Sequence, residues 1–379
     1  MGAASTWNAI LSGKGGRPIV YIQKPWRRYN QGTHRAGVVT MIACPMPATS
    51  APPDATLYIV LNAGSGHAET DERRDTIETV LRAAGRRFEL HVLDQPGAID
   101  DIAGRMAARA TAAGGVLVAA GGDGTINAVA RQAVAHGCAF GVLPQGTFNY
   151  FGRTHGIPED LAEAVHALLG ARLHPVQVGM VNERVFLVNA SIGLYPKLLE
   201  ERELDKKQFG RSRLVAALSA LKTVLSPHRR LRLVLQIDGK LQRLRTATFF
   251  VGNNRLQMEQ VGIAPLSAAL EDGRLAAVAP KTRGRLGMLW LLMHGALGKM
   301  GRLDQADQLA TFSFSRMHVK VRSLARRRTV KVATDGEVMR MTSPLEFRVL
   351  EGQLLLLKPD AAAAADPGAA SGAAAIAVH

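Results

Sequence analysis

Short apolar runs and amphipathic segments alternate through the first half of the 379-residue chain. The apolar runs at residues 57–61, 88–93, 116–119 and 139–143 are long enough for buried strands and too short for helices. Apolar positions at helical spacing follow each run, and two of these segments stop at Gly85 and Gly137. Strands that alternate with helices of about ten or more residues predict a parallel sheet with helices on both faces.

Short strands dominate the pattern after about residue 177. They are expected at residues 185–189, 231–237, 246–251, 275–278, 319–321, 329–333, 345–350 and 354–357. Asp238-Gly239 and Glu351-Gly352 have the sequence of hairpin turns. Two helical segments, 213–225 and 284–300, interrupt the strands. This half of the chain is predicted to be an antiparallel β domain, either a sandwich or an open barrel.

The pattern divides the chain into four parts. Residues 1–54 have no sustained period and end in a proline-rich stretch, so we expect a disordered leader. Whether translation starts at Met1 or Met41 stays open. We expect an α/β domain over residues 55–176, a β domain over residues 177–358 and a disordered Ala/Gly-rich tail over residues 359–379.

Composition narrows the range of partners. Hydrophobic residues make up 47% of the chain, which is ample for buried cores. Cys44 and Cys138 have neither disulfide-framework nor metal-site spacing, which favours a reducing cytosol. The net charge of +16 favours an anionic partner, and without an aromatic-rich basic patch we expect a membrane surface and no nucleic acid. The longest apolar stretch, 286–297, is too short to span a membrane.

Three glycine-bearing loops follow predicted strands of the α/β domain. Their sequences are Asn62-Ala63-Gly64-Ser65-Gly66, Gly121-Gly122-Asp123-Gly124-Thr125 and Gly146-Thr147-Phe148-Asn149. Ligands bind at the carboxyl ends of parallel strands, and a glycine turn before a helix offers free N–H groups and a positive dipole to a phosphate. The sequence has no P-loop motif, so backbone amides must hold the phosphate. A tight strand–helix connection without a ligand is the alternative interpretation.

These loops carry a resemblance to a known family. With Asn127, the segment 189–193, the segment from Ile263 to Gly273 and Asp335-Gly336-Glu337, they follow the order of the diacylglycerol kinase catalytic family, which includes bacterial lipid kinases and sphingosine and ceramide kinases. The chain resembles this family over about residues 56–358. The resemblance implies an NAD-kinase-like N-terminal domain that binds ATP and an antiparallel β-sandwich that holds the lipid.

The resemblance also assigns roles to residues. The residues implied for ATP are Asn62, Gly121, Gly122, Asp123, Gly124, Thr125, Asn127, Gly146, Thr147 and Asn149. Glu337 is implied as the general base that takes the proton of the lipid hydroxyl, with Asp335 positioning the base or a metal. The residues that match the family's Mg²⁺ loop are Ala269, Asp272 and Arg274. A hairpin turn at Asp335-Gly336 and a plain turn at Asp272-Gly273 are the alternatives.

The predicted function is transfer of the ATP γ-phosphate to a lipid hydroxyl, with diacylglycerol as the first candidate. We expect a cytoplasmic enzyme that associates peripherally with an anionic membrane, and a homodimer stays open. Tyr150 and Ala128 stand where many relatives carry acids. A non-catalytic nucleotide or lipid sensor therefore remains one alternative, and a kinase of a soluble substrate such as NAD remains another.

Overall fold

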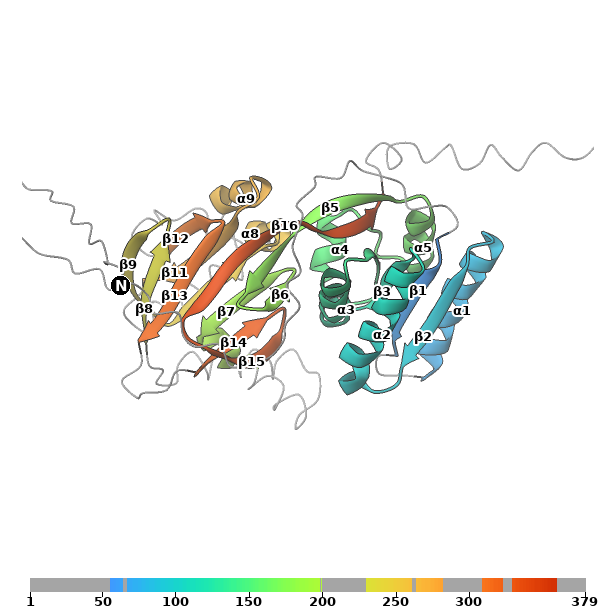
Figure 1. Cartoon of the computed structure of the whole chain (residues 1–379), viewed down its shortest axis with the longest axis horizontal. Helices are drawn as coiled ribbons and strands as arrows, with labels where there is room; N and C mark the ends of the chain where they lie inside the picture. The colour runs from blue at the N-terminus through green and yellow to red at the C-terminus, as the bar shows by residue number, and fades with distance from the viewer. Residues whose placement is uncertain are drawn as a thin grey trace, which may run out of the picture. The chain divides into compact units, whose positions relative to one another are not determined.

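The structure is a computed structural model that describes residues 55–63, 67–197, 199, 230–260, 264–281, 309–322 and 329–359 (Figure 1). All of them belong to the compact unit Pro45–His379. The predicted leader, the predicted helices at 213–225 and 284–300 and the tail beyond residue 359 lie outside the described residues. Within the described ranges, no helix combines the length and the apolar character needed to cross a membrane.

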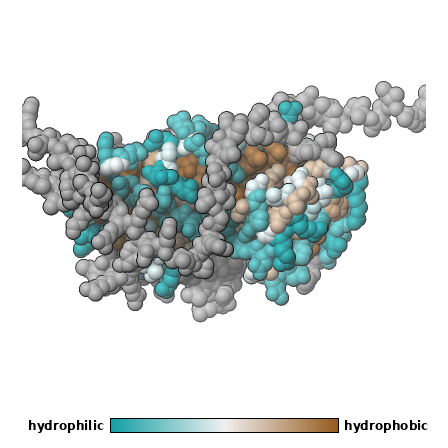
Figure 2. Space-filling view, in the orientation of Figure 1, coloured by the Kyte–Doolittle hydropathy of each residue, from teal (hydrophilic) through white to brown (hydrophobic). Residues whose placement is uncertain are grey.

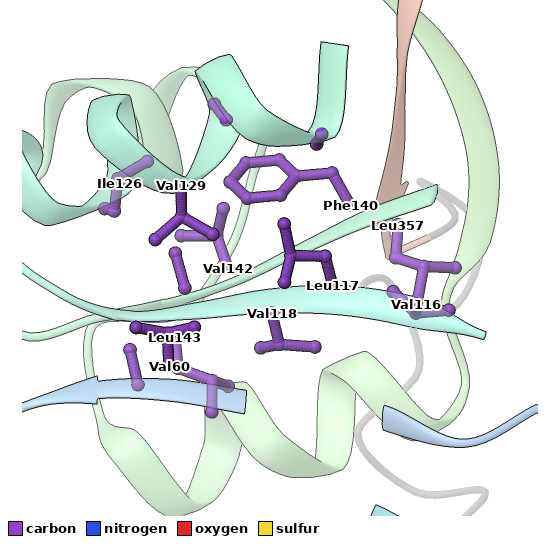
Figure 3. Packing of buried hydrophobic residues seen from close by; sticks show 14 of the residues in the cluster. Val60, Val116, Leu117, Val118, Ile126, Val129, Phe140, Val142, Leu143 and Leu357 are labelled. Carbon is purple, nitrogen blue, oxygen red and sulfur yellow. The ribbon is translucent and has the colours of Figure 1, made fainter. Parts of the chain in front are cut away.

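Four parallel strands begin the first sheet, in the order β2-β1-β3-β4. Their bounds are Leu57–Asn62 for β1, Phe88–Leu93 for β2, Val116–Gly121 for β3 and Ala139–Pro144 for β4. Every residue of β3 is buried, as expected of a strand covered on both faces. Leu117 and Val118 accordingly lie on opposite sides of this strand (Figure 3). The predicted parallel α/β arrangement is confirmed.

Helices pack in pairs beside these strands, α1 with α5 and α2 with α3. Their bounds are His67–Ala83 for α1, Ile99–Ala112 for α2, Asp123–His136 for α3 and Leu161–Leu169 for α5, and the 3₁₀ turn η1 (Pro96–Ala98) precedes α2. On the face that Figure 2 shows, hydrophilic residues make up much of the surface of this half of the fold. Gly85 and Gly137 have φ of 62° and 66°, which confirms both predicted helix stops. The short helix α4 (Tyr150–Thr154) was not predicted, because five residues are too few to show a period.

The second half of the chain forms an antiparallel sandwich, as predicted. One sheet has six strands in the order β12-β11-β10-β7-β14-β15, with bounds Leu309–Phe314, Leu275–Pro280, Thr248–Gly252, Asn189–Gly193, Thr329–Thr334 and Glu337–Thr342. The facing strands are β5 (Arg172–Val181), β6 (Arg184–Phe186), β8 (Leu231–Ile237), β9 (Lys240–Thr246), β13 (Arg316–Arg322) and β16 (Leu345–Lys358). Phe249 and Val332 of the six-stranded sheet share one core with Leu235, Val319 and Phe347 of the facing strands.

The last strand, β16, belongs to both halves of the fold. Its first part pairs with β13, its second part lies parallel to β4 at Leu356, and β5 pairs with it on both sides of Gly352. The predicted hairpin at Glu351-Gly352 is wrong. The left-handed Gly352, with φ of 66°, lies within a shift of register between Leu350 and Leu354, so the strand bends and continues. The expected domain boundary after residue 176 falls inside β5.

A second correction concerns residues 185–189, which do not form one strand. β6 ends at Phe186 and β7 begins at Asn189, because the backbone N–H groups of Leu187 and Val188 donate to the carboxylate of Asp335. The predicted strand at 246–251 begins at Thr248, after the edge strand β9. The strands β5, β9 and β12 and the helices α8 (Arg255–Gln260) and α9 (Ala264–Glu271) were not predicted.

Candidate active site

The glycine loops meet at the carboxyl ends of β1, β3 and β4. Asn62 Nδ2 donates to Thr125 Oγ1 at 2.8 Å, which ties the first loop to the second. A Cβ atom placed on Gly146 would lie 2.9 Å from the Cα atom of Gly122, so the second and third loops are in backbone contact. This approach requires glycine at position 146, whereas a Cβ atom placed on Gly122 would lie 3.4 Å from the Cα atom of Gly146, an ordinary contact. Gly64, Ser65 and Gly66 of the first loop lie outside the described residues.

The N-terminus of α3 fits a phosphate. Gly122 is the N-cap residue, and no side chain caps the helix, so its first N–H groups have no side-chain acceptor. Burial raises the pKa of the neighbouring Asp123 carboxyl, and hydrogen bonds from the backbone of Phe151, Tyr150 and Asn149 oppose this rise. Asp123 Oδ1 is buried without a hydrogen-bond partner, which leaves it available to a ligand.

A pocket of about 320 Å³ joins this helix end to the sandwich. Its lining residues are Asn62, Leu93, Ile99, Gly122, Gly124, Thr125 and Glu337. Gly124 is exposed, and a Cβ atom placed on it would meet no atom within 4 Å, so space for a ligand lies beside it. The pocket thus places the acid of the Asp-Gly-Glu segment together with the second glycine loop.

Asp335 lies in the hairpin turn that joins β14 to β15. Its φ of 46° and that of Gly336, 89°, are those of an Asp-Gly hairpin turn. Its buried carboxylate accepts hydrogen bonds from the backbone N–H groups of Leu187, Val188 and Asn189 at 2.7–2.9 Å and from Asn127 Nδ2 at 2.5 Å. All these contacts are with protein groups, so Asp335 is a positioning residue that fixes the turn against β6, β7 and α3.

Two arginines hold Glu337. Arg184 donates to Glu337 Oε2, and Arg131 Nη1 lies 3.5 Å from the same oxygen. Arg131 also donates to Asp100 Oδ1 and to Asn127 Oδ1. The side chain of Glu337 remains 46% exposed, so it can be reached from the pocket that it lines.

Sequence reasoning missed both arginines. Arg131 follows Asn127 by four residues on α3, a spacing that places the two side chains on one helix face, and this signal was available. No local pattern singles out Arg184, because it reaches Glu337 only through the pairing of distant strands. Asn127 was expected to bind nucleotide. In the structure its side-chain amide bridges Arg131 and Asp335, so Asn127 positions the Asp335-Gly336 turn.

The third loop has a structural and an exposed part. Asn149 is buried, has φ of 46° and accepts a hydrogen bond from the N–H of Gly146 through Oδ1, so its side chain closes the loop. Thr147 and Phe148 are exposed. Phe148 stacks on Tyr150 with ring centroids 5.6 Å apart, and the Tyr150 hydroxyl donates to Gln260 of α8. Tyr150 therefore joins the third loop to the sandwich.

The expected Mg²⁺ residues lie apart from this pocket, at the turn after α9. Asp272 is exposed, and Gly273 has φ of 71°. The carbonyl of Ala269 accepts the N–H of Arg274, whose own carbonyl accepts a hydrogen bond from Gln177. None of the three lines the pocket of Glu337. Within the described parts of the chain, no three acidic, His or Cys side chains gather where they could hold a metal ion.

The burial of Asp335 predicts a pH dependence of stability. Burial raises the pKa of its carboxyl to about 6, although the backbone hydrogen bonds oppose the rise. An acid with a raised pKa stabilises the fold fully below its unfolded pKa of about 3.9, and this contribution is lost as the pH rises through about 6. We expect the free energy of unfolding of the wild type, relative to Asp335→Asn, to fall by roughly 2 kcal/mol between about pH 4 and pH 7. Urea unfolding at both pH values measures it, and an unchanged difference would contradict the prediction.

The fold and the pocket define a class, an α/β domain whose glycine-lined pocket is completed by an antiparallel sandwich. Residues 56–181 match the family model of the diacylglycerol kinase catalytic domain, and residues 200–358 match that of the YegS C-terminal NAD kinase beta sandwich-like domain. A Pseudomonas aeruginosa (strain UCBPP-PA14) protein named "Probable lipid kinase YegS-like" is 32% identical over 225 residues, which cover 57% of this chain and 70% of that protein. The chain belongs to the diacylglycerol kinase family of lipid kinases.

Two further similarities agree with this family. A protein of Staphylococcus carnosus named diacylglycerol kinase is 34% identical over 96 residues, which cover 25% of this chain and 31% of that protein. The crystal structure of a diacylglycerol kinase from Bacillus anthracis superposes with a TM-score of 0.58 at 18% identity, over 81% of this chain and 98% of that one. At this identity the structural similarity shows the fold alone, and it confirms the predicted fold class, an α/β domain followed by an antiparallel β-sandwich.

Proposed function

We propose that this chain transfers the γ-phosphate of Mg·ATP to a lipid hydroxyl, with diacylglycerol as the substrate and Glu337 as the general base. The observation that carries the proposal is the pocket that places Glu337 together with Gly122, Gly124 and Thr125. Such a pocket can bring an acceptor hydroxyl and a terminal phosphate to one point, which is the main requirement of phosphoryl transfer.

ATP would bind with its phosphates at the second glycine loop. The uncapped start of α3 offers N–H groups and a helix dipole to the phosphates. Gly122 and Gly146, which are in contact there, have no side chains that could cover these N–H groups. The unpartnered, buried Asp123 Oδ1 fits a metal ion carried with the nucleotide. Bound Mg²⁺ would neutralise charge on the phosphates. Ala269, Asp272 and Arg274 remain a proposed second Mg²⁺ position, with Asp272 as its one carboxylate.

In the reaction, Glu337 would take the proton of the acceptor hydroxyl as its oxygen forms a bond to the γ-phosphorus. The bond between that phosphorus and the bridging oxygen breaks, and ADP leaves with the electron pair. Arg131 and Arg184 orient the Glu337 carboxylate, and their positive charge lies beside the position where the transferred group would accumulate negative charge. The acceptor lipid would come from an anionic membrane surface in the cytoplasm, where the enzyme would bind peripherally.

The test is transfer of label from γ-labelled ATP to two acceptors, vesicles that contain diacylglycerol and free NAD, with and without a chelator of Mg²⁺. We expect label in the lipid fraction only, and none after chelation. Label on NAD alone would favour the soluble-substrate kinase. Binding of ATP without label on either acceptor or on a mixed lipid extract would favour the sensor.

A further inference from the structure

The outer face of the sandwich at the end of its larger sheet carries a cluster of positive charge. β13, β8 and β9 lie side by side there, and β9 is the edge strand (Figure 1). Leu233, Leu235 and Val319 of these strands are buried in the core between the sheets. The alternate residues therefore point outward. The outward positions are Arg232, Val234 and Gln236 of β8, Leu241, Arg243 and Arg245 of β9, and His318, Lys320 and Arg322 of β13.

Three arginines form a row across this face. Arg322 lies opposite Arg232, and Arg232 lies opposite Arg245 in the antiparallel register. Directly opposed residues have Cβ atoms roughly 5 Å apart, and like charges at that distance destabilise a sheet. Lys320 and Arg243 flank Val234 in the next row, so five of the nine outward positions are basic and none is acidic.

Protection of the sheet edge explains only part of this arrangement. Lysine and arginine on an edge strand discourage pairing with another chain, and that accounts for Arg243 and Arg245 of β9. It does not account for Arg232 and Arg322, which lie on strands inside the sheet. Both of these line a surface hollow of about 450 Å³ together with Arg243 and Arg245. Its other lining residues are Leu233, Val234 and Leu244.

We propose that this arginine face, defined by Arg232, Arg243, Arg245, Lys320 and Arg322, docks the protein on the phosphate headgroups of an anionic phospholipid bilayer. Charge complementarity supports this occupant, since guanidinium groups match phosphate oxygens. The side chain of Leu241, on the same face of β9, is 68% exposed and can enter the apolar side of the interface. None of the nine outward side chains is a Phe, Tyr or Trp on which bases could stack, so the face fits nucleic acid less well.

This docking proposal rests on the proposed function, because only an enzyme with a lipid substrate needs to dock on a membrane. Binding to vesicles can nevertheless be measured without phosphate transfer. The full chain is sedimented with phosphatidylcholine vesicles that either contain or lack phosphatidylglycerol. The test variant carries Arg232→Gln, Arg245→Gln and Arg322→Gln. The control carries Arg82→Gln, Arg105→Gln and Arg109→Gln, which remove the same charge from exposed positions on α1 and α2. Removing opposed like charges relieves repulsion, so the test variant is expected to fold at least as stably as the wild type.

We expect the wild type to bind only the vesicles that contain phosphatidylglycerol. Each basic side chain near such a surface increases partitioning roughly fivefold, so the test variant should lose on the order of a hundredfold and the control less than about threefold. Equal loss in both variants would show that net charge alone attracts the membrane and would overturn the proposal. Undiminished binding by the test variant would overturn it as well. Loss of duplex DNA binding in the test variant, with vesicle binding intact, would assign the face to nucleic acid.

A second measurement separates this proposal from the proposed function. Phosphate transfer to a short-chain diacylglycerol in uncharged detergent micelles should be equal in the wild type and the test variant. Equal activity in micelles with lost vesicle binding supports the arginine face as a docking surface. If neither the wild type nor the variants transfer phosphate, the kinase reaction is refuted. The docking surface still stands in that case if the wild type and the control bind vesicles and the test variant does not.

Discussion

Replacing Glu337 with Gln is expected to lower kcat for phosphate transfer to diacylglycerol by about a thousandfold, within the range that a general base contributes. Gln has the same shape and can still accept a hydrogen bond from Arg184, so the Asp335-Gly336 turn before it should keep its structure. It cannot take the proton of the attacking hydroxyl. Because the proton transfer belongs to the chemical step, the affinity for ATP should change by less than about threefold. Initial rates and equilibrium binding of ATP measure the two effects.

The control for this variant is Glu346→Gln. Glu346 is also paired with an arginine of the sandwich, Arg316, at 3.3 Å, and it lies outside the Glu337 pocket. Its kcat should match that of the wild type. A Glu337→Gln variant that retains a tenth or more of wild-type kcat would refute the role of Glu337.

Replacing Gly146 with Ala is expected to damage both stability and nucleotide binding. The new Cβ would lie 2.9 Å from the Cα of Gly122 and 2.9 Å from Asn149 Oδ1. The first contact is with backbone, so the two loops must separate, at a cost of about 1–3 kcal/mol in the free energy of unfolding. The separation moves the start of α3 away from the position that we propose for the phosphates of ATP. We expect ATP affinity to fall on the order of a hundredfold, since several aligned N–H groups are displaced together.

Gly124→Ala is the matched comparison, in the same motif. Its Cβ would meet no protein atom within 4 Å, and alanine in the first turn of α3 should raise stability by up to about 1 kcal/mol. Because Gly124 lines the pocket, this variant should weaken ATP binding without loss of stability. Urea unfolding and calorimetric titration with ATP compare the two variants. If Gly146→Ala unfolds and binds like the wild type, the loops are not coupled as described.

The α/β half could be predicted because its signals are local. The apolar runs of β1, β3 and β4 are buried along most of their length, so burial and sequence agree in these strands, whereas the edge strand β2 is buried only at Leu93. The errors occurred where pairing with distant strands decides the structure. Glu351-Gly352 has the local sequence of a turn, yet β5 pairs on both sides of it and keeps β16 continuous. β9 was missed because five of its seven residues are Lys, Arg, Gln or Thr, as an exposed edge strand permits.

The candidate site divides in the same way. Gly122, Gly124 and Thr125 stand in one short motif, and the structure places all three in the pocket. Asp335 was expected to help position the base or a metal. Its carboxylate instead accepts hydrogen bonds from the backbone N–H groups between β6 and β7, and no sequence pattern near residue 335 reveals these contacts. Arg184 lies 153 positions before Glu337 in the chain, so only the folded sheets bring the two together.

The continuous strand β16 also has a consequence for biosynthesis. β4 receives its second neighbour only at Leu356, close to the end of β16, although β4 itself is complete at residue 144. While the ribosome synthesises the intervening chain, the apolar edge of β4 stays unpaired. The sandwich also lacks β16, the strand that pairs with β5 and β13. Both cores therefore close after translation of the last strand, and the nascent chain needs protection from aggregation until then.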